Sequence, residues 1–241
     1  MEASVNRLDV PGTSNFREVA PGLLVPGVLY RSDALHRLTS QGRRRLGELG
    51  IRRVIDLRSK IDRRIGGRDR LRGTGIDYVR VPIDGAPRGA DPRTVNLRDV
   101  YAFVLAHHRR ELGDVIRRIA ESDGPIVVHC TAGKDRTGLV VALALSAVGI
   151  EREEILADYA ATEANLSGEW TERMLRKLRR FRVHVSDDLL EVLAGSPPAL
   201  LAETLDGLDE RYGGVEQYLE SAGVDPAVRA RLRGRLLPGS V

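Results

Sequence analysis

The chain has 241 residues, of which 42% are hydrophobic and 30% are charged, a composition typical of one globular domain over residues 1–241. The net charge is +4, but the basic residues are spread along the whole chain and only 4% of residues are aromatic. A nucleic-acid-binding protein concentrates its cations on one element and interleaves them with aromatic residues, so we expect no nucleic-acid partner.

The sequence gives no sign of a membrane or secreted protein. The first residues, MEASVNRLDVPG, lack the basic and apolar segments of a secretory signal peptide. The longest apolar stretch, residues 139–148, is too short to span a bilayer. The single cysteine, Cys130, cannot form an internal disulfide, which fits a reducing compartment. We therefore expect a cytoplasmic protein, and export by a route without such a signal stays open.

The first half of the chain alternates strand-like and helix-like segments. Residues 23–30, broken by Pro-Gly, are expected to form a hairpin or a pair of edge strands. Thr39 is expected to cap a helix that runs to Gly50. The other expected elements are strands at 51–57, 76–83 and 125–128, helices at 94–107 and 109–121, and a helical or looped segment at 60–72. This order predicts an α/β fold with a central, mostly parallel sheet of about four to five strands.

The second half of the chain is expected to be almost wholly helical. The predicted helices are 151–162, 163–182, 186–193, 200–211, 215–221 and 226–236. Within 163–182, an apolar stripe from Leu166 to Phe181 predicts an amphipathic helix packed on the domain, and a surface for anionic lipid is the alternative. Asp56, Asp84 and Cys130 follow predicted parallel strands, and ligands bind where such strands end.

The stretch from His129 to Gly138, HCTAGKDRTG, holds the strongest motif in the chain. An arginine six residues after the cysteine carries little information by itself, because the chain is rich in arginine. The flanking His129, the glycine at position three and Thr137 make it specific, as does its place between a strand and a helix. The alternative interpretation is a cysteine without a chemical role that only packs at the end of a strand.

This loop has the residue types that activate a thiol toward phosphate. Successive N–H groups in a turn and a helix N-terminus attract anions, which stabilises a Cys130 thiolate and a phosphate dianion alike. Arg136 can clamp two phosphate oxygens, and His129 adds positive potential. Thr137 can hydrogen-bond the sulfur as it leaves. The phosphate-binding residues we predict are Thr131, Ala132, Gly133, Lys134 and Thr137.

HCTAGKDRTG resembles the P-loop of the protein-tyrosine phosphatase superfamily. Its Gly-Lys-Asp-Arg-Thr form is similar to the bacterial branch that also accepts phosphoserine, phosphothreonine and phosphoinositides. Further motifs of this branch are Asn15-Phe16-Arg17, Leu29-Tyr30-Arg31-Ser32, Ile55-Asp56-Leu57-Arg58-Ser59, Asp158-Tyr159-Ala160 and Tyr212-Gly213-Gly214-Val215. The resemblance implies a PTP-like fold over nearly the whole chain. One departure is Asp62, where the family pattern has Glu, and the shorter carboxylate is expected to weaken a contact there.

The resemblance implies a cysteine-dependent phosphatase with Cys130 as nucleophile and Arg136 as the phosphate-binding residue. It also suggests that Asp135 is the general acid, although a carboxylate at this position could instead only cap the helix. Asp56 and Asp84 are the rival acids, and Asp99, which lies in an expected helix, comes last. His129, Asp56 and Arg58 are expected to support the site.

The expected substrates are phosphorylated proteins, phosphotyrosine first, and phosphoinositides, with no metal or cofactor. Lys134 would favour multiply anionic ligands, or it is a solvated charge. The resemblance suggests that a region at about 163–185 forms a mobile lid. A phosphate-binding pseudophosphatase and a rhodanese-like sulfurtransferase are the alternative functions.

Overall fold

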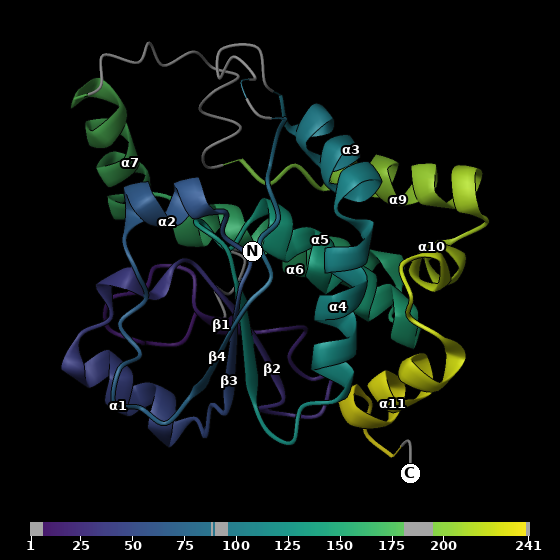
Figure 1. Cartoon of the computed structure of the whole chain (residues 1–241), viewed down its shortest axis with the longest axis horizontal. Coiled ribbons are helices and arrows are strands. Elements are labelled where there is room, and N and C mark those ends of the chain that lie inside the picture. The colour runs from purple at the N-terminus through teal and green to yellow at the C-terminus, as the bar shows by residue number, and fades with distance from the viewer. Residues whose placement is uncertain (1–6, 88, 90–95, 181–194, 240–241) are drawn as a thin grey trace.

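The chain folds around a five-stranded sheet (Figure 1), in a computed structural model that describes residues 7–87, 89, 96–180 and 195–239. The strand order is β1-β2-β5-β3-β4, and neighbouring strands are parallel except for β1 and β2. The strands are β1 (Arg17–Glu18), β2 (Leu29–Ser32), β3 (Arg53–Asp56), β4 (Asp77–Arg80) and β5 (Ile126–His129). The predicted α/β class and mostly parallel sheet are confirmed.

Helices cover both faces of the sheet, and they dominate the described chain after β5, as predicted. Before β5 they are the short 3-10 helix η1 (Leu35–Arg37), α1 (Ser40–Glu48), α2 (Lys60–Gly66), α3 (Leu97–His107) and α4 (Arg109–Ala120). After β5 they are α5 (Asp135–Val148), α6 (Arg152–Leu166), α7 (Glu169–Arg180), α9 (Pro198–Tyr212), α10 (Val215–Ser221) and α11 (Pro226–Leu236). Figure 1 shows α1 on one side of the sheet and α4, α5 and α11 on the other.

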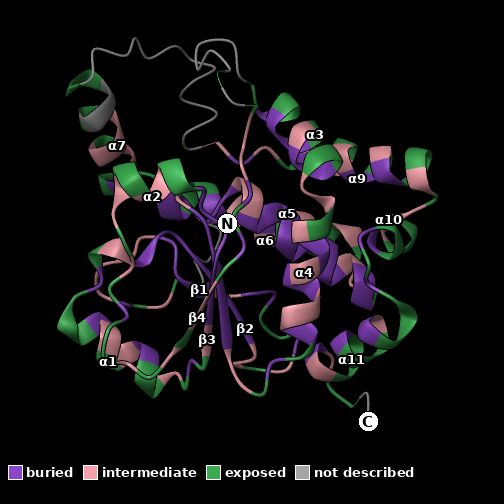
Figure 2. Ribbon diagram, viewed as in Figure 1, coloured by how far each residue is buried: buried purple, intermediate pink, exposed green. Residues whose placement is uncertain are grey.

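Alternating strand residues build a separate core on each face of the sheet. In β3, Val54 packs in the cluster that includes Leu46 of α1, whereas Ile55 joins the larger cluster formed with α3, α4 and α5. In β5, Val127 and Val128 divide in the same way. Because successive side chains of a strand point to opposite faces, these apolar runs are buried on both sides, as in other parallel sheets. Figure 2 shows the buried residues along the strands and on the facing sides of the helices.

Helix α5 passes through the middle of the larger core and begins at the cysteine loop. Eleven of its 14 residues are buried. It ends at Gly149, whose φ of 85° lies in the left-handed region that glycine adopts without strain. A helix fixed along its whole length gives the loop at its N-terminus a rigid support.

The expected hairpin at residues 23–30 is wrong. Only the end of this segment enters β2, which instead pairs antiparallel with residues 17–18, a short strand that the sequence did not reveal. Gly22 and Gly27 both have positive φ, 86° and 75°, and they keep the chain between the two strands in turns.

The expected helix boundary at residues 162–163 is also wrong. Helix α6 continues to Leu166, and α7 starts at Glu169, because Gly168 has a φ of 72° and ends the helical path there. The predicted helix at 186–193 lies outside the described residues, as do residues 181–185 at the end of the predicted lid.

Within the described ranges, no helix combines the length and the apolar character needed to cross a bilayer.

Two mid-helix glycines provide a test of the packing around α4. A Cβ on Gly113 would lie 2.2 Å from the Ala222 carbonyl oxygen, whereas a Cβ on Gly207 of α9 would have nothing within 4 Å. We expect Gly113→Ala to lower the free energy of unfolding by about 1–3 kcal/mol through overpacking. Gly207→Ala should raise it by about 0.5–1 kcal/mol through helix propensity. Urea denaturation measures both, and an equal effect of the two substitutions would contradict the packing described.

Candidate active site

The lone cysteine lies on a short loop between β5 and α5, at the carboxyl edge of the sheet. His129 is the last residue of β5, Cys130 follows it, and α5 begins at Asp135. Cys130 is only 2% exposed, so its thiol lies at the base of the loop and not on the surface. The structure thus has the strand–loop–helix order predicted for this motif.

The carbonyl groups of the loop are held from behind. The Thr131 carbonyl accepts a hydrogen bond from the Ala34 N–H at 3.2 Å. Asn15 Nδ2 donates to the Ala132 carbonyl at 2.9 Å and to the Gly133 carbonyl at 3.3 Å. Arg31 Nη2 also donates to the Gly133 carbonyl, at 2.9 Å. The C=O and the N–H of a trans peptide point in opposite directions. The N–H groups of residues 132, 133 and 134 therefore point away from these donors, which is the arrangement of an anion nest.

Gly133 is required by the shape of this loop. Its φ is 71°, and a Cβ at this position would lie 2.3 Å from the Ser32 carbonyl oxygen. Gly138, one turn into α5, has a similar need, since a Cβ there would lie 2.9 Å from the Tyr159 ring. Both glycines of the motif therefore allow a close approach of the loop and helix to their neighbours.

A buried network fixes the donors behind the loop. Arg31 and Arg17 are 0% and 1% exposed, and both form ion pairs with Asp158 of α6. Arg17 also donates to the Thr162 hydroxyl at 2.8 Å and to the Asn15 side chain. The motifs at residues 15–17, 29–32 and 158–160, which are far apart in the sequence, are therefore parts of one support for the loop.

Arg136 lies beside the thiol and is held in place by its own contacts. Its guanidinium donates to Asp62 Oδ2 at 2.6 Å, to the Ile83 carbonyl at 3.0 Å and to Thr131 Oγ1 at 3.4 Å. Burial raises the pKa of the Cys130 thiol, but the charge of Arg136 and hydrogen bonding from Thr137 outweigh it, so the pKa falls below its usual value. A lowered pKa is what a reactive thiolate requires.

Asp62, the residue that departs from the family pattern, reaches Arg136 despite its shorter side chain. It is the third residue of α2, and it forms a capping box with Ser59, with N–H···O distances of 3.0 and 3.1 Å. Burial raises the pKa of Asp62, yet Arg136 brings it below the usual value. Asp62 therefore makes the contact in spite of its shorter side chain, because the helix start carries the carboxylate to the guanidinium.

A second charged cluster surrounds His129, the residue that precedes Cys130. The buried His129 ring has Nδ1 3.1 Å from the Cys130 carbonyl oxygen and Nε2 3.1 Å from Asp69 Oδ2. Burial lowers the pKa of His129, but Asp69 and Asp56 raise it to about 9, so the ring is a cation at neutral pH. Arg58 pairs with both carboxylates, at 2.8 Å from Asp69 and 2.9 Å from Asp56.

This cluster is also where a metal would be sought, because ligand atoms of Asp56, Asp69 and His129 lie within 4.8 Å of one another. The charges of Arg58 and the His129 cation already balance the two carboxylates. The cluster is therefore an internal ion-pair network, and it lacks the excess negative charge that a bound cation needs.

The candidate acids occupy different positions. Asp135 is in the first turn of α5, with its side chain 20% exposed and its Oδ1 3.1 Å from the Tyr101 hydroxyl and 3.0 Å from Lys134 Nζ. Asp56 is 0% exposed. Asp84 is half-buried, beyond β4, and its N–H donates to His108. Asp99 is exposed and pairs with the cap residue of α3.

Lys134 is buried, so the alternative that it is a solvated charge is wrong. Its side chain is 0% exposed, and Nζ donates to the Gly195 carbonyl at 2.6 Å as well as facing Asp135. Lys134 thus joins the loop to the chain that precedes α9, and its charge is in the immediate surroundings of the site.

Helix α7 packs beside the loop through Trp170 and Met174, two residues of the predicted apolar stripe. Trp170, 7% exposed, forms a small cluster with Ala132 of the loop, Leu166 and Met174. A cavity of about 60 Å³ lies between this helix, the loop and α2, with Asp62, Thr131 and Trp170 among its lining residues. The described part of α7 is therefore packed on the domain next to the site.

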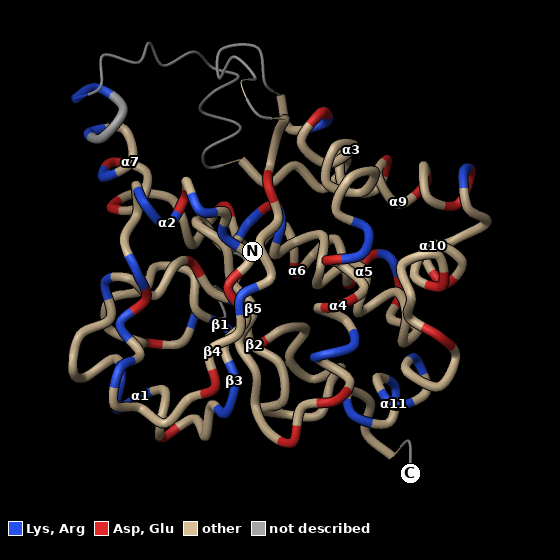
Figure 3. The backbone as a smooth tube through the Cα atoms, in the orientation of Figure 1, with Lys and Arg blue, Asp and Glu red and all other residues tan. Residues whose placement is uncertain are grey.

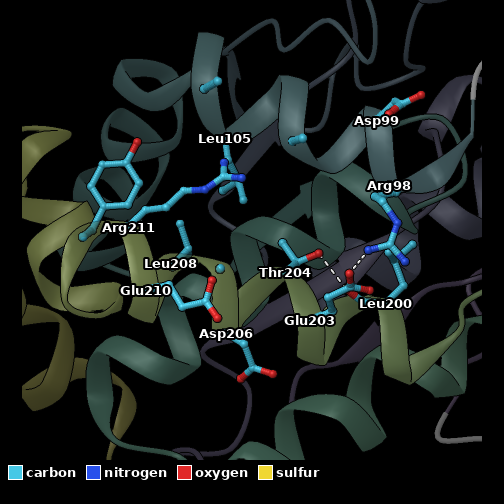
Figure 4. A pocket seen from close by; sticks show the side chains of 14 residues that line it. Arg98, Asp99, Leu105, Leu200, Glu203, Thr204, Asp206, Leu208, Glu210 and Arg211 are labelled. Carbon is cyan, nitrogen blue, oxygen red and sulfur yellow. Dashed lines mark hydrogen bonds and ion pairs between the residues drawn. The ribbon is translucent and has the colours of Figure 1, made fainter.

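A larger groove of about 540 Å³ lies between α3 and α9, away from the loop (Figure 4). Arg98 of α3 and Glu203 of α9 form an ion pair across it. No residue of the cysteine loop lines this groove, so we assign it no part in catalysis.

Comparison with known proteins gives the site its context. A family model described as "Tyrosine phosphatase family" matches residues 8–238. The chain belongs to the tyrosine phosphatase family. It is 33% identical to the triple specificity protein phosphatase PtpB of Mycobacterium tuberculosis over an alignment of 277 residues, covering 95% of this chain and 98% of that protein. A tyrosine-protein phosphatase of Nostoc commune is 32% identical over 219 residues, covering 86% and 73%.

Solved structures of phosphatases also resemble the chain, at lower similarity. TpbA of P. aeruginosa is 21% identical with a TM-score of 0.39, over 76% of this chain and 98% of that one. The core catalytic domain of the PP-IP phosphatase SIW14 of S. cerevisiae is 16% identical with a TM-score of 0.42, over 72% and 96%. Scores this low support no inference about the site.

The sequence does not reveal two residues near the site. Asp69 follows α2 in a charged segment, and nothing in the neighbouring sequence distinguishes it from the other charges there. Tyr101 is on a helix face that predicts core packing, although its hydroxyl meets Asp135. Both contacts join segments far apart in the chain, which local patterns do not reveal.

The His129–Asp69 pair predicts a dependence of stability on pH. The pKa of His129 is about 9 in the folded protein and about 6.5 unfolded, so its contribution is complete below pH 6.5 and is lost as the pH rises through 9. Asp56 and Asp69 have lowered pKa values and stay ionised throughout this range. Urea denaturation should therefore show the free energy of unfolding falling between pH 6.5 and pH 9.

Asp69→Asn should lower the free energy of unfolding by about 3 kcal/mol at neutral pH, because it removes a partner of two buried cations. It should also move the pH-dependent decline to lower pH. Asp77→Asn is the matched control, since Asp77 pairs with Arg53 at the surface with its side chain 53% exposed, and the cost there should stay below about 1 kcal/mol. Equal costs for the two variants would argue against a buried pair.

Proposed function

We propose that this chain hydrolyses phosphate monoesters through a cysteinyl-phosphate intermediate, with Cys130 as nucleophile, Arg136 as phosphate clamp and Asp135 as proton donor. One observation carries the proposal. The loop aims three backbone N–H groups away from the buried donors behind it, beside a thiol whose pKa Arg136 lowers. Thiolate, amide groups and guanidinium in one loop are what in-line attack on a phosphoryl group requires.

In the first step, the Cys130 thiolate attacks phosphorus while the bond to the ester oxygen breaks. Three phosphoryl oxygens receive hydrogen bonds from the loop N–H groups and the Arg136 guanidinium, which stabilise the charge of the transition state. Asp135 gives its proton to the leaving oxygen, so that an alcohol or phenol departs in place of an alkoxide or phenoxide.

In the second step, water attacks the phosphocysteine and the sulfur leaves as a thiolate. Asp135, now ionised, accepts a proton from this water, which restores its acid form and releases inorganic phosphate. Thr137 is fully buried and adjacent in space to the thiol, and its hydrogen bonding lowers the thiol pKa. The same interaction would stabilise the departing thiolate.

Asp135 is the candidate acid that the geometry favours. Asp56 is fully buried and accepts hydrogen bonds from Arg58 and Tyr78; burial raises its pKa, but His129 and Arg58 hold it well below the usual range, so it stays ionised at neutral pH. Asp99 is exposed and bound to its own helix cap. Asp84 keeps a place as second choice, because it is half-buried beyond β4.

We propose that the substrates include phosphotyrosine, phosphoserine or phosphothreonine, and phosphoinositides. The name of the relative PtpB, a triple specificity phosphatase, supports more than one class of substrate. The buried Lys134 supports it as well, because a second cation in the loop favours ligands with several negative charges. Membership of the tyrosine phosphatase family disfavours a sulfurtransferase. A pseudophosphatase would bind phosphate esters without turning them over, so an activity assay distinguishes it from the enzyme.

The nucleophile is tested by Cys130→Ser with p-nitrophenyl phosphate and a phosphotyrosine peptide. We expect kcat to fall at least about 10⁴-fold while binding of inorganic phosphate persists, because the loop N–H groups and Arg136 remain. Arg136→Lys should lower kcat/KM by about 10²–10³-fold, since a point charge replaces a planar fork. Activity that survives in Cys130→Ser, or no turnover by the unaltered chain, would overturn the mechanism.

The acid is tested by Asp135→Asn. We expect kcat for the phosphotyrosine peptide to fall about 10²-fold, and the decline of kcat at high pH to flatten, because that decline reports loss of the donated proton. The loss should be smaller with p-nitrophenyl phosphate, because its leaving group is a stable anion that depends less on a donated proton. Asp99→Asn is the control and should leave the profile unchanged. An unchanged profile in Asp135→Asn, with the flattening found in Asp84→Asn, would transfer the role to Asp84.

A further inference from the structure

Helix α2 presents an unusual surface to solvent. Ile61 and Ile65 are 66% and 67% exposed, and they are the large hydrophobic residues most exposed in the described part of the chain. They are four positions apart in one helix, so they lie on the same face. Figure 2 shows the outer side of α2 as exposed. Two aliphatic side chains left in water beside a catalytic loop call for a partner.

The charges around these isoleucines are all of one sign at the surface. We define the α2 surface as Lys60, Ile61, Arg64, Ile65 and Arg68, all of which are exposed. Arg70 and Arg72, which follow, are exposed too. The two acidic residues of this segment turn inward, since Asp62 pairs with Arg136 and Asp69 has a side chain only 1% exposed. Figure 3 shows basic residues on α2, whereas α7 carries both basic and acidic residues.

The α2 surface is tied directly to the catalytic loop. Asp62, between Ile61 and the next turn of α2, is 2.6 Å from the Arg136 guanidinium. The cavity of about 60 Å³ also has walls from α2, α7 and the loop, with Gly66, Trp170 and Thr131 among them. Whatever covers Ile61 and Ile65 is therefore held within a few side chains of the phosphate site.

Aliphatic side chains surrounded by cations fit the interface of an anionic membrane. Such an interface rewards shallow insertion of apolar groups together with Coulomb attraction of Lys and Arg to acidic headgroups, at about 1 kcal/mol per cation. The energetic centre of a protein interface is commonly a Trp, Tyr or Arg in a desolvated pocket, and the α2 surface has no aromatic residue. Charge complementarity therefore favours a lipid surface over a protein partner.

We infer that the α2 surface docks the protein on anionic membranes and brings phosphorylated headgroups to the cysteine loop. Ile61 and Ile65 insert between lipids, while Lys60, Arg64 and Arg68 contact the acidic headgroups. The role in substrate delivery rests on the proposed function, whereas the docking itself does not depend on catalysis.

The test is sedimentation with vesicles of phosphatidylcholine alone and of phosphatidylcholine with about 30% phosphatidylserine, an anionic lipid that attracts Lys and Arg. The unaltered chain should bind the anionic vesicles at least about tenfold more strongly than the neutral ones. Ile61→Ser with Ile65→Ser should weaken binding at least about tenfold, since serine keeps a similar helix propensity and removes the apolar groups. Arg64→Gln with Arg68→Gln should weaken it about 25-fold, or about fivefold per charge.

A control variant matched in charge is Arg44→Gln with Arg110→Gln, which removes two exposed cations from α1 and α4 and should leave binding within about twofold of the unaltered chain. Turnover of p-nitrophenyl phosphate, a soluble substrate, should be unchanged in all three variants. This readout separates failure of docking from failure of folding or of the proposed chemistry.

Several results would overturn the inference. One is equal binding to neutral and anionic vesicles, and another is loss of binding in the α1 and α4 control as large as in the α2 variants. The third is measured by light scattering. If the chain binds no vesicle but forms a dimer, and Ile61→Ser with Ile65→Ser abolishes that dimer, the surface would be assigned to a second copy of the chain. Loss of vesicle binding confined to the α2 variants supports docking, even if phosphoinositides prove not to be substrates.

Discussion

The site depends on the direction in which three peptide groups face. The carbonyls of residues 131–133 are bound by Ala34, Asn15 and Arg31, and this contact alone turns the following N–H groups toward the side where a phosphate would bind. A flexible loop would lose these directions and would have to pay their ordering entropy each time a ligand bound. The buried Arg17–Arg31–Asp158 network holds them in advance, which is why motifs far from the cysteine belong to its chemistry.

Opposing charge networks then set the protonation states in the loop. On one side, Asp62 holds Arg136 beside the thiol, and the guanidinium favours the thiolate. Below, Asp69 and Asp56 keep His129 cationic, with its ring against the Cys130 carbonyl. Each cation is paired with a carboxylate, so the cost of burying its charge is compensated. Stability and reactivity therefore rest on the same ion pairs.

The sequence predicted the parts of the fold that follow from local patterns. Alternation of strands and helices gave the mostly parallel sheet, and the boundaries of α10 and α11 agree with the structure because capping and turn residues mark them. The sequence did not predict the pairing of β1 with β2, because that pairing depends on a turn geometry set by several glycines. It also did not predict the helix break at Gly168, because the apolar stripe continues past this residue. In the site, the motif identified the loop, but Asp69 and Tyr101 meet it only through tertiary contacts.

The same reasoning explains why Asp62 suffices where the family pattern has a longer carboxylate. A helix start has a fixed geometry, and the capping box with Ser59 places the carboxylate of its third residue at the helix N-terminus. There it accepts from the Ser59 N–H and from Arg136 through one oxygen, Oδ2. Helix α2 is thus anchored to Arg136 through Asp62, while Ile61 and Ile65 of the same helix are exposed.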